Sequence, residues 1–199
     1  MMDPDEAVQL VQIDELRTQR LAFRLPDPSL ATELSEYYLR NAQHFAACCP
    51  RRPPGFHAVE AWRERAAGLR QASLTGRALH LLLFLVDGST SEIVGDVNFT
   101  GILRGAFQAA YLGYELDRAH VGKGLMFEAL AASIGHVFER MKLHRVMANY
   151  VPTNERSGRL LRKLGFSVEG YARDYLLLDG TWKDHVLTSL VNQQYRDAV

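Results

Sequence analysis

Alternating apolar and polar residues predict a strand near the start of the chain, over residues 20–25. A helix is predicted over 27–41, because its first residues are an aspartate, which is a favoured N-cap, and a proline, which fits the first helical turn. Apolar residues at helical spacing predict a second helix over 59–75. The loop between the two helices contains the breaker-rich segment CCPRRPPG (48–55).

The middle of the chain reads as three consecutive strands, over 78–86, 93–103 and 108–116. The first of them is rich in leucine, which by itself is compatible with a strand or a helix. Short links, DGSTSE and RGAF, separate the three segments. Because short connections join antiparallel neighbours, we expect a meander here.

The last third of the chain predicts a βαβ unit. An amphipathic helix over 123–141 lies between the third strand and a further strand over 144–151, and such a crossover normally makes the two strands parallel. A short helix that ends at a glycine, and two strands joined by the turn DGTW, are predicted next, over 154–165, 171–178 and 184–191. The predicted fold class is therefore α+β, with helices around one mixed sheet.

Length and composition favour one globular domain that spans residues 1–199. Residues 1–16 carry no strong pattern, and we expect them to be a disordered N-terminus. The longest apolar run, LLLFLV, is far too short to cross a bilayer, and the acidic start MMDPDEAVQL lacks the regions of a signal peptide. These features predict a protein without a membrane partner.

Charge and cysteine content narrow the function classes. The formal net charge is zero and no dense run of Lys or Arg occurs, so nothing indicates direct nucleic-acid binding. The two cysteines, Cys48 and Cys49, are adjacent and predict no disulfide framework, which indicates a cytoplasmic protein. The chain also lacks the His-Glu-x-x-His pattern, and we predict no metal site.

A glycine-rich turn, VGKGL, connects the third strand of the meander to the long helix. A P-loop would need a glycine at Asp117 and a hydroxyl residue at Gly124, and a dinucleotide-binding loop would need a third glycine at Phe127. Both motifs are therefore excluded. The remaining interpretation is a pair of glycines, Gly122 and Gly124, whose backbone amides meet a pyrophosphate at a helix N-terminus. On spacing alone, a tight turn without a ligand is an equal alternative.

Four blocks around this turn resemble a known family. They are NFTGILRGAFQAAYLGYEL, GKGLMFEAL, HRVMANYVPTNERSGRLLRKLGF and EGYARDYLLLDGTWKDHVLTSL. Their order and spacing resemble the GNAT (Gcn5-related) N-acetyltransferases, and among these the RimJ-type ribosomal-protein-alanine N-acetyltransferases. The agreement covers residues 94–190, and RTQRLAFR resembles the first strand of the same group, whereas 26–80 match only loosely. The chain departs from the family pattern Gln/Arg-x-x-Gly-x-Gly/Ala at its first position, where Ala119 stands.

The resemblance implies the GNAT fold, with a central mixed and mostly antiparallel sheet flanked by helices, and acetyl-CoA as the cofactor. It places the cofactor in the gap between two splayed strands, 108–117 and 144–151. The residues expected to bind acetyl-CoA are Leu116, Val121, Gly122, Lys123, Gly124, Leu125, Asn149, Asn154 and Ser157.

Three residues are candidates for catalysis. By resemblance, Ser157 protonates the departing thiolate, although Asn154 and Ser157 also have the spacing of a simple helix N-cap. Glu115, at the end of a splayed strand, and Asp174, in the strand 171–178, are candidates for the general base. An α-amine has a pKa of about 7.7–8, so water could serve as well.

The function implied is direct transfer of an acetyl group to the N-terminal alanine of a small-subunit ribosomal protein. The partner would be that N-terminus or the ribosome, and the enzyme a monomer or homodimer. Two alternatives stay open from the sequence. One keeps the chemistry and changes the acceptor to another protein N-terminus, a small amine or an antibiotic. The other is a ribosome-assembly factor in which acetylation is incidental.

Overall fold

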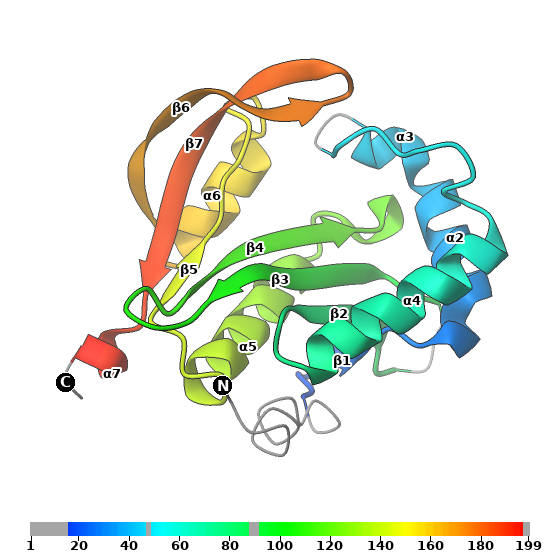
Figure 1. Cartoon of the computed structure of the whole chain (residues 1–199), viewed down its shortest axis with the longest axis horizontal. Helices are drawn as coiled ribbons and strands as arrows, with labels where there is room; N and C mark the ends of the chain where they lie inside the picture. Colours follow the sequence, from blue (N-terminus) through cyan, green and yellow to red (C-terminus); the bar gives the residue numbers. More distant parts are fainter. Residues whose placement is uncertain (1–15, 47–48, 88–91, 197–199) are drawn as a thin grey trace.

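A single seven-stranded sheet organises the molecule (Figure 1). The structure is a computed structural model that describes residues 16–46, 49–87 and 92–196. In space the strands follow the order β1-β2-β3-β4-β5-β7-β6. Their bounds are β1 (Leu21–Arg24), β2 (Leu79–Leu85), β3 (Gly95–Leu103), β4 (Ala109–Leu116), β5 (Arg145–Met147), β6 (Ser167–Leu178) and β7 (Thr181–Val191).

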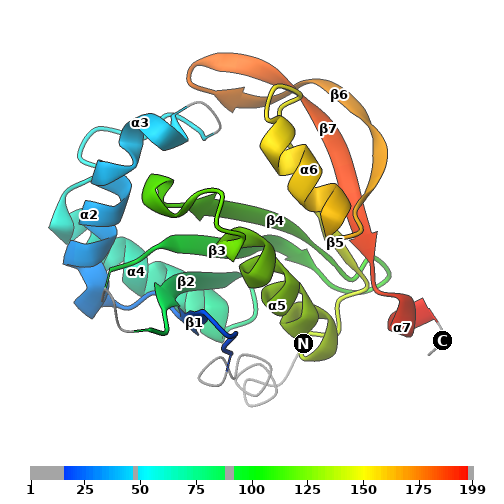
Figure 2. The same cartoon turned by 180° about the vertical axis from the view of Figure 1, so that it is seen from behind.

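Helices cover both faces of this sheet (Figures 1 and 2). Helices α2 and α4 pack on one face and α5 on the other, and α6 lies beside β6 and β7. The bounds are η1 (Pro28–Leu30), α2 (Ala31–Arg40), α3 (Ala42–Phe45), α4 (Val59–Leu74), η2 (Arg118–His120), α5 (Leu125–Glu139), α6 (Glu155–Lys163) and α7 (Gln193–Arg196).

Two hydrophobic clusters follow from this layering. One joins the sheet to α5 and α6 and includes Phe99, Leu130 and Leu161. The other joins the opposite face to α2 and α4 and includes Tyr37 and Trp62. Burial of such large apolar side chains stabilises a fold by about 1.5–3 kcal/mol each, so both faces of the sheet contribute.

The β4–β5 pair is parallel, and every other neighbouring pair is antiparallel. Its pairing is short, because Ala109 to Tyr111 meet Arg145 to Met147 and no described residue of β5 pairs with β4 beyond that point. The strand β4 nevertheless continues to Leu116. The two chains therefore part, and a gap opens in the middle of the sheet.

The predicted α+β class and the mixed, mostly antiparallel sheet are confirmed. The helix predicted from residue 123 begins at Leu125 instead, because Gly122 and Gly124 have φ of 82° and 77°, outside the helical range. The strand predicted over 144–151 spans only Arg145–Met147 and ends where its pairing with β4 ends, and beyond it Tyr150 forms an isolated bridge to Val186 of β7. The strand predicted from residue 171 begins at Ser167, and its pairing with β7 contains irregularities that weaken the alternating pattern.

Two further expectations concern the ends and the surroundings of the chain. The predicted disordered N-terminus falls almost entirely on residues outside those described. Among the described residues, no helix combines the length and the apolar character needed to span a membrane.

Candidate active site

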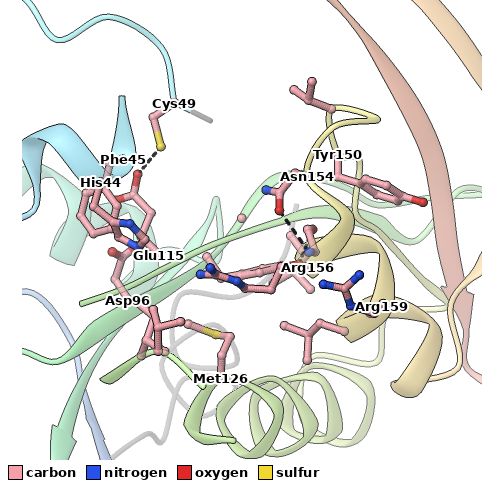
Figure 3. A pocket seen from close by; sticks show the side chains of 18 of the residues that line it. His44, Phe45, Cys49, Asp96, Glu115, Met126, Tyr150, Asn154, Arg156 and Arg159 are labelled. Atoms are coloured by element: carbon pink, nitrogen blue, oxygen red, sulfur yellow. Dashed lines mark hydrogen bonds between the residues drawn. The ribbon is translucent and has the colours of Figure 1, made fainter. Parts of the chain in front are cut away.

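The gap between β4 and β5 opens into a cavity of about 900 Å³ (Figure 3). Its walls come from β4, the segment after β5, the starts of α5 and α6, and the region of α2 and α3. Most of the residues predicted to form the site line it: Glu115, Leu116, Val121, Gly122, Gly124, Leu125, Asn149, Asn154 and Ser157.

The glycine-rich turn forms one end of this cavity. Gly122 and Gly124 both have positive φ, which other L-residues rarely adopt, and a Cβ built on Gly122 would meet open space. Gly124 is the N-cap of α5, and no side chain of a described residue caps the helix there. The first amides of α5 therefore face the cavity end with the positive pole of the helix, a geometry suited to an anion.

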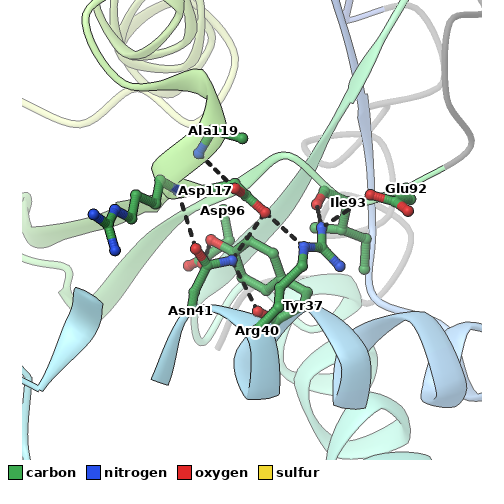
Figure 4. Close-up of polar contacts among 9 residues, drawn as sticks. Tyr37, Arg40, Asn41, Glu92, Ile93, Asp96, Asp117 and Ala119 are labelled. Carbon is green, nitrogen blue, oxygen red and sulfur yellow. Dashed lines mark hydrogen bonds and ion pairs between the residues drawn. The ribbon is translucent and has the colours of Figure 1, made fainter. Parts of the chain in front are cut away.

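A buried polar cluster attaches this turn to α2 (Figure 4). The Asp117 carboxylate accepts hydrogen bonds from Arg40 Nε at 2.6 Å, from Asn41 Nδ2 at 2.9 Å and from the Ala119 amide at 2.8 Å. Asn41 Oδ1 accepts in turn from the Arg118 amide at 3.0 Å. Burial of Asp117 tends to raise the pKa of its carboxyl, but the hydrogen bonds from Asn41 and Arg40 outweigh burial and lower that pKa below its ordinary value.

Arg20, which directly precedes β1, binds the glycine-rich turn from another side. Its Nε lies 2.6 Å from Glu128 Oε2, its backbone amide 3.0 Å from Glu128 Oε1, and its NH1 group 2.9 Å from the carbonyl oxygen of Lys123. Glu128 stands in the first turn of α5. One guanidinium thus binds both the helix and the turn that precedes it.

Ser157 occupies the start of α6 with two separate contacts. Its backbone amide donates to Asn154 Oδ1 at 3.1 Å, so the N-cap interpretation of this pair is correct for the backbone. Its hydroxyl oxygen lies 2.7 Å from the phenolic oxygen of Tyr114 on β4. The cap therefore does not use the Ser157 hydroxyl. The role of this hydroxyl as the acid that protonates the thiolate stays a prediction.

Asn149, in the segment after β5, is held in place from two sides. Its Nδ2 donates to the Tyr175 hydroxyl at 3.0 Å, and its Oδ1 accepts from the Thr188 amide at 3.3 Å. Both partners belong to the β6–β7 hairpin. The hairpin thus fixes the edge of the gap where the cofactor arm is expected.

Glu115 lines the cavity, but a cation already pairs with it. Its Oε1 accepts from Arg52 NH2 at 2.8 Å and from the Cys49 thiol at 2.7 Å. Asp96 stands directly opposite Glu115 in the β3–β4 register and also lines the cavity. Sequence analysis did not identify Asp96, although an ionisable residue within the apolar strand IVGDVNF is itself an unusual signal.

Two of the predicted residues are not brought into the cavity wall. The exposed Asp174 lies at an irregular part of β6 with φ of 49°, and its amide donates to Asp184 Oδ1 at 2.9 Å. The exposed Lys123 contributes its backbone carbonyl to Arg20. The geometry therefore gives no support to Asp174 as a base, and these two assignments stay predictions.

The remaining features fit acetyl-CoA. The open space at Gly122 and the uncapped start of α5 suit its pyrophosphate, while the parting of the two strands provides a slot for an extended arm. Arg156 and Arg159 of α6 also line the cavity, and sequence analysis missed both (Figure 3). A volume of about 900 Å³ is within the range of small-molecule sites.

Comparison with known proteins agrees with this geometry. The chain is 43% identical over 180 residues to the [ribosomal protein uS5]-alanine N-acetyltransferase of Escherichia coli, covering 90% of this chain and 92% of that protein. The structure superposes with a TM-score of 0.85 on the ribosomal-protein-S5-alanine acetyltransferase of Vibrio fischeri, at 36% identity, covering 90% and 97% of the two chains. For Mycobacterium smegmatis RimJ in complex with CoA-disulfide, the TM-score is 0.81 and the identity 30%, with coverage of 87% and 83%. Residues 20–167 match the family model of the acetyltransferase (GNAT) domain, and the chain therefore belongs to the GNAT acetyltransferases.

Proposed function

We propose that this enzyme transfers the acetyl group of acetyl-CoA to the N-terminal alanine of a small-subunit ribosomal protein, with uS5 as the first candidate. One observation carries the choice of acceptor: the 43% identity to the Escherichia coli uS5-alanine enzyme extends over nearly the full length of both chains. It thus includes the region of α2 and α3, which forms one wall of the cavity. A ribosomal acceptor would place the enzyme in the cytoplasm.

The overall reaction requires few chemical groups from the protein. The acetyl thioester, which acetyl-CoA supplies, becomes an amide on the acceptor nitrogen, and the products are CoA thiol and one proton when the acceptor starts as an ammonium. The residues must therefore bind the donor, exclude competing water, and move protons.

Binding of the donor is assigned to the two ends of the gap. The amides after Gly122 and Gly124 would hold the pyrophosphate at the start of α5, with Arg156 adding positive charge from α6. Asn149 and Asn154 would hold the arm between the parted strands. The hydroxyl of Ser157, in contact with Tyr114, is the candidate to protonate the thiolate. Since a thiol has a pKa near 8.5, this step needs only modest assistance.

Mass spectrometry of ribosomal protein N-termini, in cells with and without the gene, tests the acceptor. Loss of the acetyl group from one alanine-starting protein, with restoration by the wild type and not by a Gly122→Asp variant, is the expected result. Purified enzyme should also acetylate a peptide that carries this N-terminus faster than the same peptide starting with serine or methionine.

Two other results would overturn the proposal. Normal acetylation of every ribosomal protein, combined with turnover of a small amine or an antibiotic, would identify a different acceptor. Normal acetylation combined with a defect in ribosome assembly would instead indicate an assembly factor.

A further inference from the structure

Asp96 is a buried carboxyl group that faces the cavity without a cation. Its residue is 7% exposed, and the hydroxyls of Tyr37 and Tyr38 donate to the same oxygen, Oδ2, at 3.2 and 3.3 Å. Figure 4 shows Asp96 beside Tyr37. Among the described residues, no lysine, arginine or histidine forms an ion pair with it. A buried carboxylate in this state is costly unless a positive group joins it or a proton neutralises it.

The neighbouring Glu115 shows the contrast. It is the register partner of Asp96, and Arg52 balances its charge at 2.8 Å. Two adjacent acids thus share one protein cation. Burial, followed by the negative charge of Glu115, raises the pKa of Asp96 well above its ordinary value.

We propose that Asp96 receives the primary ammonium group of the acceptor and takes a proton from it before acetyl transfer. The inference deepens the proposed function and rests on it, because it requires an amine acceptor. It also moves the role of general base from Glu115, which is paired with Arg52, to Asp96, whose positive partner would be the ammonium group of the substrate.

The proton balance of this step is simple. An N–H bond of the ammonium breaks, its proton joins a carboxylate oxygen of Asp96, and the electron pair stays on nitrogen as the lone pair that attacks. A buried ion pair becomes a neutral acid beside a neutral amine, which a site of low polarity favours. After the product leaves, the carboxyl group returns its proton to water. An α-amine pKa of about 7.7–8 lies only about 4 units above that of an ordinary aspartate, and the raised pKa of Asp96 narrows this gap.

The surroundings hold this acid in a fixed position. The Tyr38 ring stacks on Trp62 with centroids 4.6 Å apart and an angle of 10° between planes, and the Arg52 guanidinium lies 5.1 Å from the centre of the same ring. Tyr38 therefore cannot swing away without breaking both contacts. The two hydroxyls hold Oδ2 from α2 and the Asn98 side chain also hydrogen-bonds the carboxyl group, while Asp96 still lines the cavity that the ammonium would enter.

The titratable groups that face Asp96 come from two packed elements. They are Tyr37 and Tyr38 of α2 and Glu115 of β4, and beyond Glu115 stand Arg52 and Cys49 of the loop before α4. Burial raises the pKa of both tyrosines well above their ordinary value, so neither hydroxyl loses its proton near neutral pH. A change of activity between pH 6 and 9 that depends on Asp96 therefore does not arise from them.

The test is the pH profile of an Asp96→Asn variant, which keeps the shape and removes the proton acceptor. The substrate is the peptide or small amine that wild-type enzyme acetylates best, and the matched control is Glu64→Gln on the exposed face of α4. At pH 7 we expect kcat/KM to fall about 100-fold in Asp96→Asn. The deficit should shrink as the pH rises to 9, because the amine then arrives without its extra proton. Affinity for acetyl-CoA should stay unchanged in calorimetry.

Other results would overturn either the role of Asp96 alone or the proposed function as well. A deficit of the same size at every pH, or no deficit, overturns the inference and leaves the proposed function intact. A wild-type enzyme that acetylates no peptide and no small amine overturns both.

A second measurement needs no variant and covers the case in which Asp96→Asn does not fold. In wild-type enzyme with CoA bound, an alanine-starting peptide is compared with an analogue that has propionyl in place of alanyl and so lacks the amine. Binding of the amine peptide should be tighter by about 10-fold. Equal affinities would contradict the inference. If a small amine displaces the peptide with the same affinity as the peptide itself, Asp96 recognises the ammonium charge and not the peptide chain.

Discussion

The hydroxyl of Ser157 lies 2.7 Å from the hydroxyl of Tyr114 and so links the start of α6 to β4 across the cavity. The backbone amide of the same serine is bound by Asn154. The backbone amide of Ser157 thus forms the cap, while its hydroxyl is in contact with β4 on the opposite wall of the cavity. This arrangement makes it possible to test the hydroxyl without removing the cap.

The first prediction concerns Ser157→Ala. The amide contact to Asn154 should persist, so acetyl-CoA affinity in calorimetry should change by less than about 3-fold, whereas kcat should fall by about 10- to 100-fold. Tyr114→Phe, which removes the partner hydroxyl and keeps the ring, should cause a smaller decrease. If Ser157→Ala alters only the melting temperature or the cofactor affinity, the serine is a structural or binding residue.

The second prediction compares two glycines in equivalent backbone states. Gly122 and Gly105 have φ of 82° and 72°, and a Cβ on either meets no atom within 4 Å. Gly122→Asp and Gly105→Asp should therefore lose similar stability, about 1 kcal/mol, from backbone strain. Only Gly122→Asp should lose acetyl-CoA binding in calorimetry, because its carboxylate would face the pyrophosphate. Equal cofactor affinities in the two variants would refute the assignment of the turn.

The third prediction uses the pH dependence of Asp117. Its folded-state pKa lies below the ordinary value of 3.8, so the group stabilises the fold above pH 3.8 and loses this contribution as the pH falls through the folded pKa. The free energy of unfolding, from denaturant titrations at pH 7, 5, 4 and 3, should be lower for Asp117→Asn than for wild type at pH 7. The difference should shrink below pH 4. A constant difference, or an equal change in the control Glu64→Gln, would show that the ionised carboxylate is not the cause.

Sequence patterns predicted the sheet and its flanking helices because each element carries its own local signal. The alternation in RLAFRL and the apolar stripe of the long helix both report burial on one face. Element boundaries were less accurate where a neighbour decides them. The strand β5 ends at Met147, where its pairing with β4 ends and where the Thr188 amide of β7 donates to the Asn149 side chain; both partners lie far from β5 in the sequence.

The walls of the cavity were only partly predictable for the same reason. The glycine turn and Asn154 lie in short motifs, so their positions follow from nearby residues. Asp96 depends on contacts from 58 and 59 positions away, through Tyr38 and Tyr37, and the hold of Arg20 on Glu128 spans 108 positions. Pairings over such separations leave no periodic trace in one sequence. They emerge only when the sheet brings the partners together.

The last prediction concerns this long-range hold. Arg20 binds Glu128 and the Lys123 carbonyl at once through a planar fork of donors, which the single ammonium of lysine cannot reproduce. Arg20→Lys should therefore loosen the turn while keeping the charge. Because the pair is partly exposed, we expect only a modest loss of acetyl-CoA affinity, about 3- to 10-fold, and faster hydrogen exchange of the amides at residues 122–126. Arg63→Lys, at an exposed ion pair on α4, is the control and should change neither quantity. Wild-type affinity and exchange in Arg20→Lys would mean that the glycines and the Asp117 cluster hold the turn without Arg20.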